Sequence, residues 1–198
     1  VDGPMARTVE DLALFLDTLS GLDYRDPLSV RPPIKPYIHA LNDNISKLNI
    51  GISADYGFLA CAPEVRQSIN EAEKMFIDMG HNVEKTSPDF SNAEEIFQIL
   101  RAHMLATDKR ELYSTHKNIM KEDLRLNIEK GLALNEEQIS KAQLARGQLI
   151  KKTNMFFDEY DILISPSAMV APFSIKEPWP KKVENREFDN YVSWLMTA

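Results

Sequence analysis

Two serines flank a proline directly after a short apolar run. Ile162 to Ile164 are consecutive and apolar, without polar alternation, which is typical of a strand buried on both faces of a parallel sheet. Pro166 cannot donate to a strand ladder, so the strand is expected to end there. Because ligands of open α/β sheets bind beyond the carboxyl ends of the strands, Ser165, Pro166 and Ser167 are candidate ligand-binding residues. The alternative is that the serines only cap the end of the strand.

The other reactive side chains do not form a recognisable catalytic or metal-binding set. The histidines have no partner at metal-ligand spacing, so no metal site is predicted at His39, His81, His103 or His116. The sequence contains no phosphate-binding glycine motif and no G-x-S-x-G nucleophile motif. Cys61 lies in a predicted loop without an adjacent basic residue, which predicts a small buried thiol instead of a nucleophile.

Composition narrows the class of protein. The chain has 198 residues, of which 43% are hydrophobic and 27% charged, as in a globular domain of good size. Its net charge of −7 and the absence of a Lys and Arg cluster predict no nucleic-acid partner. No apolar run approaches the length of a membrane span, so no membrane partner is predicted. The single cysteine excludes an internal disulfide and favours a reducing, cytoplasmic compartment.

Hydrophobic periodicity predicts an α/β fold. Strands are expected near residues 48–53, 82–86 and 161–165. An amphipathic helix at 63–79 separates the first two strands, which must therefore run parallel with a right-handed crossover. Further helices are expected at residues 91–112, 117–131 and 135–157. Residues 23–36 and 171–186 are rich in proline and predict irregular segments, and residues 188–196 form a short amphipathic segment.

Capping signals mark the helix ends. Thr8 is the expected N-cap of the first helix, and Gly21 is expected at its C-terminal end. The many apolar residues of this helix predict that the helix is mostly buried. Two further capping boxes are predicted, at Ser91 with Glu94 and at Asn135 with Gln138. The last of these opens the longest helix.

Arg146 lies on that longest helix, beside an apolar face that includes Ala142 and Leu149. An arginine in this position can bury its stem and present the guanidinium group at the edge of the face. One interpretation is an ion pair with a carboxylate on a helix or loop.

Three motifs together resemble the amidase signature enzymes. Residues 3–11, GPMARTVED, resemble the family segment G-P-M-A-R-T-V-x-D, and residues 22–27, LDYRDP, are similar to its G-x-D-x-R-D-P. Residues 160–167, YDILISPS, resemble its Y-D-x-L-L-x-P-T strand. Residues 128–132, Ala142 and Arg146 keep the family order between them. The resemblance covers the whole chain and implies an α/β fold with a mixed sheet flanked by helices, present as one partial domain over residues 1–198.

The resemblance implies an enzyme that hydrolyses a carboxamide to a carboxylate and ammonia or an amine. The family uses a serine–cis-serine–lysine triad, and in family order all three residues precede Gly3. The chain is therefore expected to be an internal or C-terminal portion without catalytic residues or a cofactor, inactive alone. Its share would be the wall of the acyl pocket, with Ser165, Pro166, Ser167 and Arg146 as substrate-binding residues. Exposed apolar surface is expected where the missing strands would pack.

The resemblance leaves several alternatives open. In some family members an arginine at the place of Arg146 reaches an anionic group of the substrate, which is the alternative to an ion pair. One family branch supplies ammonia for tRNA-dependent amidation, but that branch carries several tyrosines where this chain has residues 132–143. A stand-alone enzyme for a small-molecule amide is therefore preferred, with a homodimer left open. The rival from another class is a non-catalytic binding or assembly piece.

Overall fold

The computed structural model describes residues 3–188 and 190–196. The chain divides into two compact units, Val1–Ser46 and Lys47–Ala198.

The first unit contains two helices joined by a long loop. Helix α1 spans Val9–Leu19, and the Thr8 hydroxyl accepts a hydrogen bond from the Asp11 N–H at 3.1 Å, which confirms the predicted cap. Helix α2, Tyr37–Ala40, was not predicted. The Asp17 carboxylate of α1 accepts from the first N–H groups of α2, Tyr37 at 2.7 Å and Ile38 at 3.0 Å. This carboxylate satisfies donors that a helix cannot pair internally and ties the two helices together.

Two predictions about α1 are wrong. Ala13 is the one buried residue of this helix, whereas Val9, Leu14 and Leu19 are each more than half exposed. Within its unit the helix has only a four-residue helix and a loop to pack against, so most of its apolar face has no cover. Gly21 does not take the left-handed backbone of a C-terminal cap, because the helix ends through an extended Ser20.

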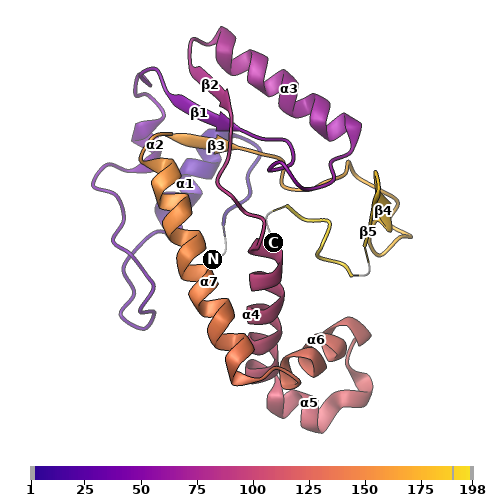
Figure 1. The fold of residues 1–198 in the computed structure, drawn as a ribbon. Coiled ribbons are helices and arrows are strands. Elements are labelled where there is room, and N and C mark those ends of the chain that lie inside the picture. Colours follow the sequence, from indigo (N-terminus) through magenta and orange to yellow (C-terminus); the bar gives the residue numbers. More distant parts are fainter. Residues whose placement is uncertain (1–2, 189, 197–198) are drawn as a thin grey trace. The chain divides into compact units, whose positions relative to one another are not determined.

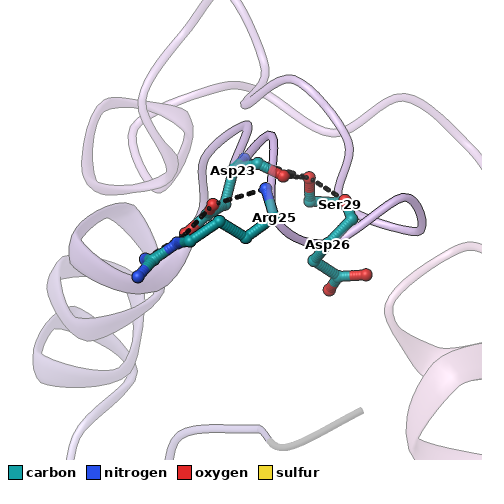
Figure 2. A network of polar contacts seen from close by, with 4 residues as sticks. All are labelled: Asp23, Arg25, Asp26 and Ser29. Carbon is teal, nitrogen blue, oxygen red and sulfur yellow. Dashed lines mark hydrogen bonds and ion pairs between the residues drawn. The ribbon is translucent and has the colours of Figure 1, made fainter.

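The predicted loop at residues 23–36 is ordered locally by its own polar groups (Figure 2). Asp23 forms an ion pair with Arg25 at 2.6 Å and accepts from the Arg25 N–H at 2.9 Å. The Ser29 hydroxyl lies 2.8 Å from the backbone carbonyls of both Asp23 and Asp26. These are turn-type contacts between near neighbours in the sequence, and they fold the L-D-Y-R-D-P motif back on itself.

A three-stranded parallel sheet forms the centre of the second unit. Strands β1 (Asn49–Ile52), β2 (Asn82–Lys85) and β3 (Ile162–Ile164) are arranged in the order β2-β1-β3, and β1 pairs in parallel with both neighbours. The three predicted strands and the parallel pairing of the first two are confirmed. This three-stranded sheet is therefore entirely parallel.

The buried strand is β1 and not β3, which corrects the prediction. Ile50 and Ile52 of β1 are 0% and 2% exposed. Strand β3 has a partner on one side within the described residues, and Ile162 is 38% exposed. Three consecutive apolar residues indicated burial on both faces, but burial also depends on a strand's place in the sheet order, which the local pattern does not contain.

Helix α3 (Pro63–Asp78) lies along one side of this sheet, and α4 (Ala93–Asp108) and α7 (Glu136–Phe157) extend away from it (Figure 1). Helix α3 connects β1 to β2, with Pro63 at its first position as predicted. Helices α4 and α7 run side by side, with α5 (Arg110–His116) and α6 (Glu122–Leu132) near their far end. A short 3-10 helix, η1 (Lys117–Ile119), links α5 to α6.

One of the two capping boxes predicted for this unit is confirmed. Asn135 accepts from the Gln138 N–H at 2.9 Å, and the Gln138 side chain accepts from the Asn135 N–H at 3.0 Å. The box at Ser91 is wrong, because the Ser91 hydroxyl donates to Asp89 at 2.6 Å and α4 begins only at Ala93. A nearby carboxylate competes successfully for the serine hydroxyl.

The C-terminal part of the chain is less irregular than predicted. Strands β4 (Lys182–Val183) and β5 (Arg186–Glu187) form a short antiparallel hairpin within the segment expected to be irregular. Residues 190–196 form no helix, but Leu195 pairs as an antiparallel bridge with Ala168, in the loop after β3. A core cluster of Ala62, Met169, Val183, Phe188 and Met196 joins these segments to the loop after β1.

Helices α4 and α6 approach each other closely at Gly131. A Cβ atom at Gly131 would lie 2.0 Å from the Ala102 carbonyl oxygen of α4. We expect Gly131→Ala to lower the free energy of unfolding by about 1–3 kcal/mol, because α6 must move away from α4 to accept the methyl group. The measurement is urea unfolding followed by circular dichroism.

Gly147→Ala is the matched control. Gly147 lies on α7, and a Cβ atom there has no neighbour within 4 Å. Alanine should raise stability at this position by roughly 0.5–1 kcal/mol through helix propensity alone. Equal effects of the two substitutions would contradict the close packing of α4 and α6.

Candidate substrate pocket

The loops that follow β1 and β3 lie together at the carboxyl edge of the sheet. The Ser53 N–H donates to the Ile164 carbonyl at 3.0 Å, which extends the pairing of β1 and β3 by one residue. Beyond this point the Tyr56 hydroxyl and the Ser165 hydroxyl lie 2.6 Å apart, although 109 residues separate them. The edge where a ligand was expected is therefore built from both loops.

Tyr56 occupies an unusual backbone conformation. Its φ angle is 52°, in the left-handed region, and Gly57 follows with φ 80°. The Tyr56 N–H donates to the Ser53 hydroxyl at 2.9 Å, and its ring meets the Phe90 ring edge-on, with centroids 4.9 Å apart. Backbone and side chain are thus both fixed by neighbours.

An ion-pair network stabilises this turn from the other side. The Asp55 carboxylate accepts from the Gly57 N–H at 2.9 Å and pairs with the Arg66 guanidinium of α3. Burial would raise the pKa of Asp55, but hydrogen bonds from Arg66 and from the Gly57 N–H outweigh it and keep the pKa below its usual value. Arg66 also lies 3.8 Å from Glu184, which accepts from the Cys61 N–H at 3.3 Å.

Cys61 is completely buried, as predicted, and is a free thiol. Burial raises the pKa of this thiol, with the nearby carboxylates adding to the effect and Arg66 opposing it. A fully buried thiol with a raised pKa is suited to packing and not to nucleophilic attack.

An apolar pocket of about 300 Å³ opens beside Tyr56. Its wall is formed mainly by aromatic and aliphatic side chains from the loops after β1, β2 and β3, from α4 and from the C-terminal segment, among them Phe58, Leu59, Phe90, Phe97, Met169 and Leu195. Its polar side chains include Glu94, Gln98 and Ser193, and the Glu94 carboxylate pairs with Arg186 of β5. A pocket of this kind suits an apolar group with a few polar contacts that fix its orientation.

A second pocket, of about 460 Å³, lies at the end of β1 and is charged. Asp55, Arg66, Glu73 and Lys85 contribute to its wall, and Lys85 pairs with Glu73 at 3.0 Å. Among the residues that the structure describes, Tyr56 alone lines both pockets.

The predicted substrate-binding residues lie near the apolar pocket but outside its lining. Ser165 and Pro166 are half-buried, and the Ser165 hydroxyl is hydrogen-bonded to Tyr56, which lines the pocket. Ser167 is exposed, and its backbone carbonyl accepts from the Met196 N–H at 3.1 Å. Arg146 is exposed on α7 and forms no ion pair with any residue in the described ranges.

The sequence did not identify the pocket wall itself. Tyr56-Gly57-Phe58 could be placed at the carboxyl end of a strand, but nothing local indicated a left-handed tyrosine. Phe90 and Phe97 contribute through tertiary packing, which no short pattern reveals. Within residues 3–188 and 190–196, no group of His, Cys, Asp and Glu side chains could hold a metal ion, and no helix has the length and apolarity to cross a membrane.

A family model described as Amidase matches residues 1–198. The chain belongs to the amidase signature family. The solved structure of a bacterial aryl acylamidase of this family is 26% identical, with a TM-score of 0.87, and its match covers 98% of this chain and 43% of that one. The α/β fold expected for an amidase signature protein is thereby confirmed.

Curated amidase relatives are longer than this chain. An acylamidase from Rhodococcus erythropolis is 26% identical over 198 residues, which is 98% of this chain and 42% of the relative. A glutamyl-tRNA(Gln) amidotransferase subunit from Lactiplantibacillus plantarum is 25% identical, covering 87% of this chain and 41% of that relative. The chain thus spans less than half the length of these relatives.

The Asp55–Arg66 pair gives a test of how the Tyr56 turn is held. Because the folded-state pKa of Asp55 is lowered, its contribution to stability is present above the ordinary carboxyl pKa and is lost as the pH falls through the folded-state value. Asp55→Asn should therefore lower stability at pH 7 by about 1 kcal/mol, since both partners are partly exposed. It should also weaken the acid dependence of urea unfolding.

Glu137→Gln is the control for this prediction. Glu137 pairs with Lys141 one turn along α7, and both side chains are more than 70% exposed. Exposed pairs of this kind contribute little, so the substitution should leave stability nearly unchanged. An Asp55→Asn variant as stable as this control at pH 7 would contradict a role for the pair in holding the turn.

Proposed function

We propose that this chain forms part of an amidase that hydrolyses a carboxamide to a carboxylate and ammonia or an amine. The observation that carries the proposal is the family match over residues 1–198, together with an acylamidase among the relatives. The apolar pocket at the carboxyl edge of the sheet supports it, because it offers a place for an apolar group of a small amide.

The chemistry of this proposal requires residues outside the chain. Amide cleavage needs an activated nucleophile, a base within hydrogen-bond reach and donors for the oxyanion. The proposed serine–cis-serine–lysine triad precedes Gly3 in family order. The Ser165 hydroxyl is hydrogen-bonded to Tyr56, and no hydrogen bond between described residues joins Ser165 or Ser167 to a lysine or histidine. We therefore assign this chain to substrate binding.

Ser165, Pro166, Ser167 and Arg146 remain the proposed substrate-binding residues. For the first three, the support is their position on the loop beside Tyr56. For Arg146, the support is an exposed guanidinium group without an ion pair among the described residues, which leaves it free for an anionic group of a ligand. The proposal also includes a cytoplasmic location, which the single free cysteine supports. It includes a homodimer, which the exposed apolar residues on α7 support, and no nucleic-acid partner.

The second candidate function is that of a glutaminase-type subunit of a tRNA-dependent amidotransferase. Several relatives carry that name, including the one from Lactiplantibacillus plantarum. Residues 132–143 lack the tyrosines of that branch, which favours the stand-alone enzyme. A purely non-catalytic assembly piece is the remaining alternative.

Ammonia or amine release from small aliphatic and aromatic amides tests the function. A full-length protein that joins this chain to an upstream signature loop should turn over at least one such amide without an added subunit. The 198-residue chain alone should turn over none, because nucleophile, base and oxyanion donors act as a unit. Turnover by the chain alone, abolished by Ser165→Ala or Ser167→Ala, would contradict the assignment. Activity of the full-length protein only on glutamine and only with partner subunits would favour the amidotransferase.

Arg146→Ala tests the proposed binding role of that residue in the full-length enzyme. If the guanidinium group meets a substrate anion, KM should rise about tenfold for acidic amides and little for neutral ones, because one charge-assisted hydrogen bond is lost. Arg146→Lys should recover part of the loss. The same change in KM for both classes of amide would leave Arg146 without a substrate contact.

A further inference from the structure

The position of Tyr56 between two different pockets has a consequence for ligand size. On one side lies the apolar pocket of about 300 Å³, and on the other the charged pocket of about 460 Å³. Tyr56 is the one described residue that lines both. The ring packs against Phe90, which belongs to the apolar pocket, and the hydroxyl is bonded to Ser165.

The Tyr56 side chain is held too firmly to move aside at low cost. Its hydroxyl hydrogen bond to Ser165 is 2.6 Å long, and its N–H is bonded to Ser53. The preceding residue, Asp55, is anchored to α3 through Arg66. A ligand that pushed the ring away would leave the Ser165 hydroxyl without this partner and would disturb the turn.

The volume of the apolar pocket limits what it can hold. A dry apolar cavity of about 150 Å³ is known to hold a benzene ring. A pocket of about 300 Å³ therefore takes one ring with a short extension, and an apolar group that extends further on the Tyr56 side meets the tyrosine ring. Beyond Tyr56 it would meet the Asp55–Arg66 pair, whose desolvation by an apolar group is unfavourable.

We propose that the Tyr56 side chain is the specificity-determining end wall of the apolar pocket and sets the length of the apolar group that a ligand carries. The preferred class of ligand is a small amide with one aromatic ring or a short aliphatic chain. This inference rests on the proposed function only in naming amides, because the limit on length follows from the pocket itself.

Binding of two probes that cannot be hydrolysed tests the wall directly. Benzyl alcohol and 4-phenylbutan-1-ol differ by three methylene groups, and their affinities for the full-length protein can be measured by calorimetry or by NMR titration. In Tyr56→Ala the long probe gains access to the space of the lost ring. Each methylene group that becomes buried is worth roughly a fourfold gain in affinity, so the long-to-short affinity ratio should rise about tenfold or more.

Further variants separate the wall from a merely structural role. Tyr56→Phe retains the ring and loses the hydrogen bond to Ser165, so the affinity ratio should stay within about twofold of the unmodified protein. Tyr56→Leu should raise the ratio by an intermediate amount, and it provides the test if Tyr56→Ala does not fold. Tyr113→Ala, which removes an aromatic ring from α5 outside both pockets, should leave the ratio unchanged.

The inference would be overturned if neither probe bound the unmodified protein. An unchanged ratio in both Tyr56→Ala and Tyr56→Leu, or an equal rise in Tyr56→Phe and Tyr56→Ala, would also overturn it. The probes contain no amide, so a protein that hydrolyses nothing can still show the change in ratio. Loss of the proposed function and loss of the wall are therefore distinguishable, and amide kinetics on the same variants would show whether kcat/KM follows the affinity ratio.

Discussion

The parallel pairing of β1 with two neighbours is the constraint on which the second unit depends. Ile50 of β1 is paired with Val83 of β2 on one side and with Ile162 of β3 on the other. Parallel strands cannot be joined by a tight hairpin, so each connection must travel away from the sheet and return. Helix α3 makes the short return to β2, whereas α4 to α7 make the long one to β3. Because all three strands point the same way, the loops after β1 and β3 emerge at one edge.

That edge becomes a pocket because the C-terminal segment closes over it. The Met169 carbonyl accepts from the Ala62 N–H at 2.8 Å, and the Met169 N–H donates to the Trp194 carbonyl at 3.1 Å. Met169 is 1% exposed and lies between the loop after β1 and residues 190–196. The chain returns along the loop after β3, and its buried Val192 and Met196 line the pocket. Apolar packing thus converts a sheet edge into a concave site.

Local signals in the sequence were sufficient to predict where the helices and strands lie, but not which of them are buried. The strand pattern at β1 and the Asn135 capping box depend on residues that are neighbours in the sequence, and both were predicted correctly. The burial of β3 was overestimated, since its apolar residues could not reveal that β1 takes the central place. Ser91 matched a capping pattern, but Asp89, two residues earlier, took its hydroxyl. The family motifs identified the edge of the sheet, whereas the pocket wall depends on Phe90, Phe97 and Tyr56, which meet only in the folded chain.

Two residues break the ordinary backbone preferences, and one ion-pair network links them. Tyr56 and Glu184 are the non-glycine residues with positive φ in the described part of the chain, at 52° and 49°. Arg66 pairs with Asp55, next to Tyr56, and with Glu184 itself. A left-handed conformation costs a side-chain-bearing residue about 1–2 kcal/mol, so it persists only where the surroundings determine it. Here Arg66 of α3 supports both turns. The first turn orients Tyr56. The second belongs to the β4–β5 hairpin, which brings Arg186 to Glu94 in the pocket wall. Both left-handed residues, Tyr56 and Glu184, therefore lie in turns that shape the same pocket.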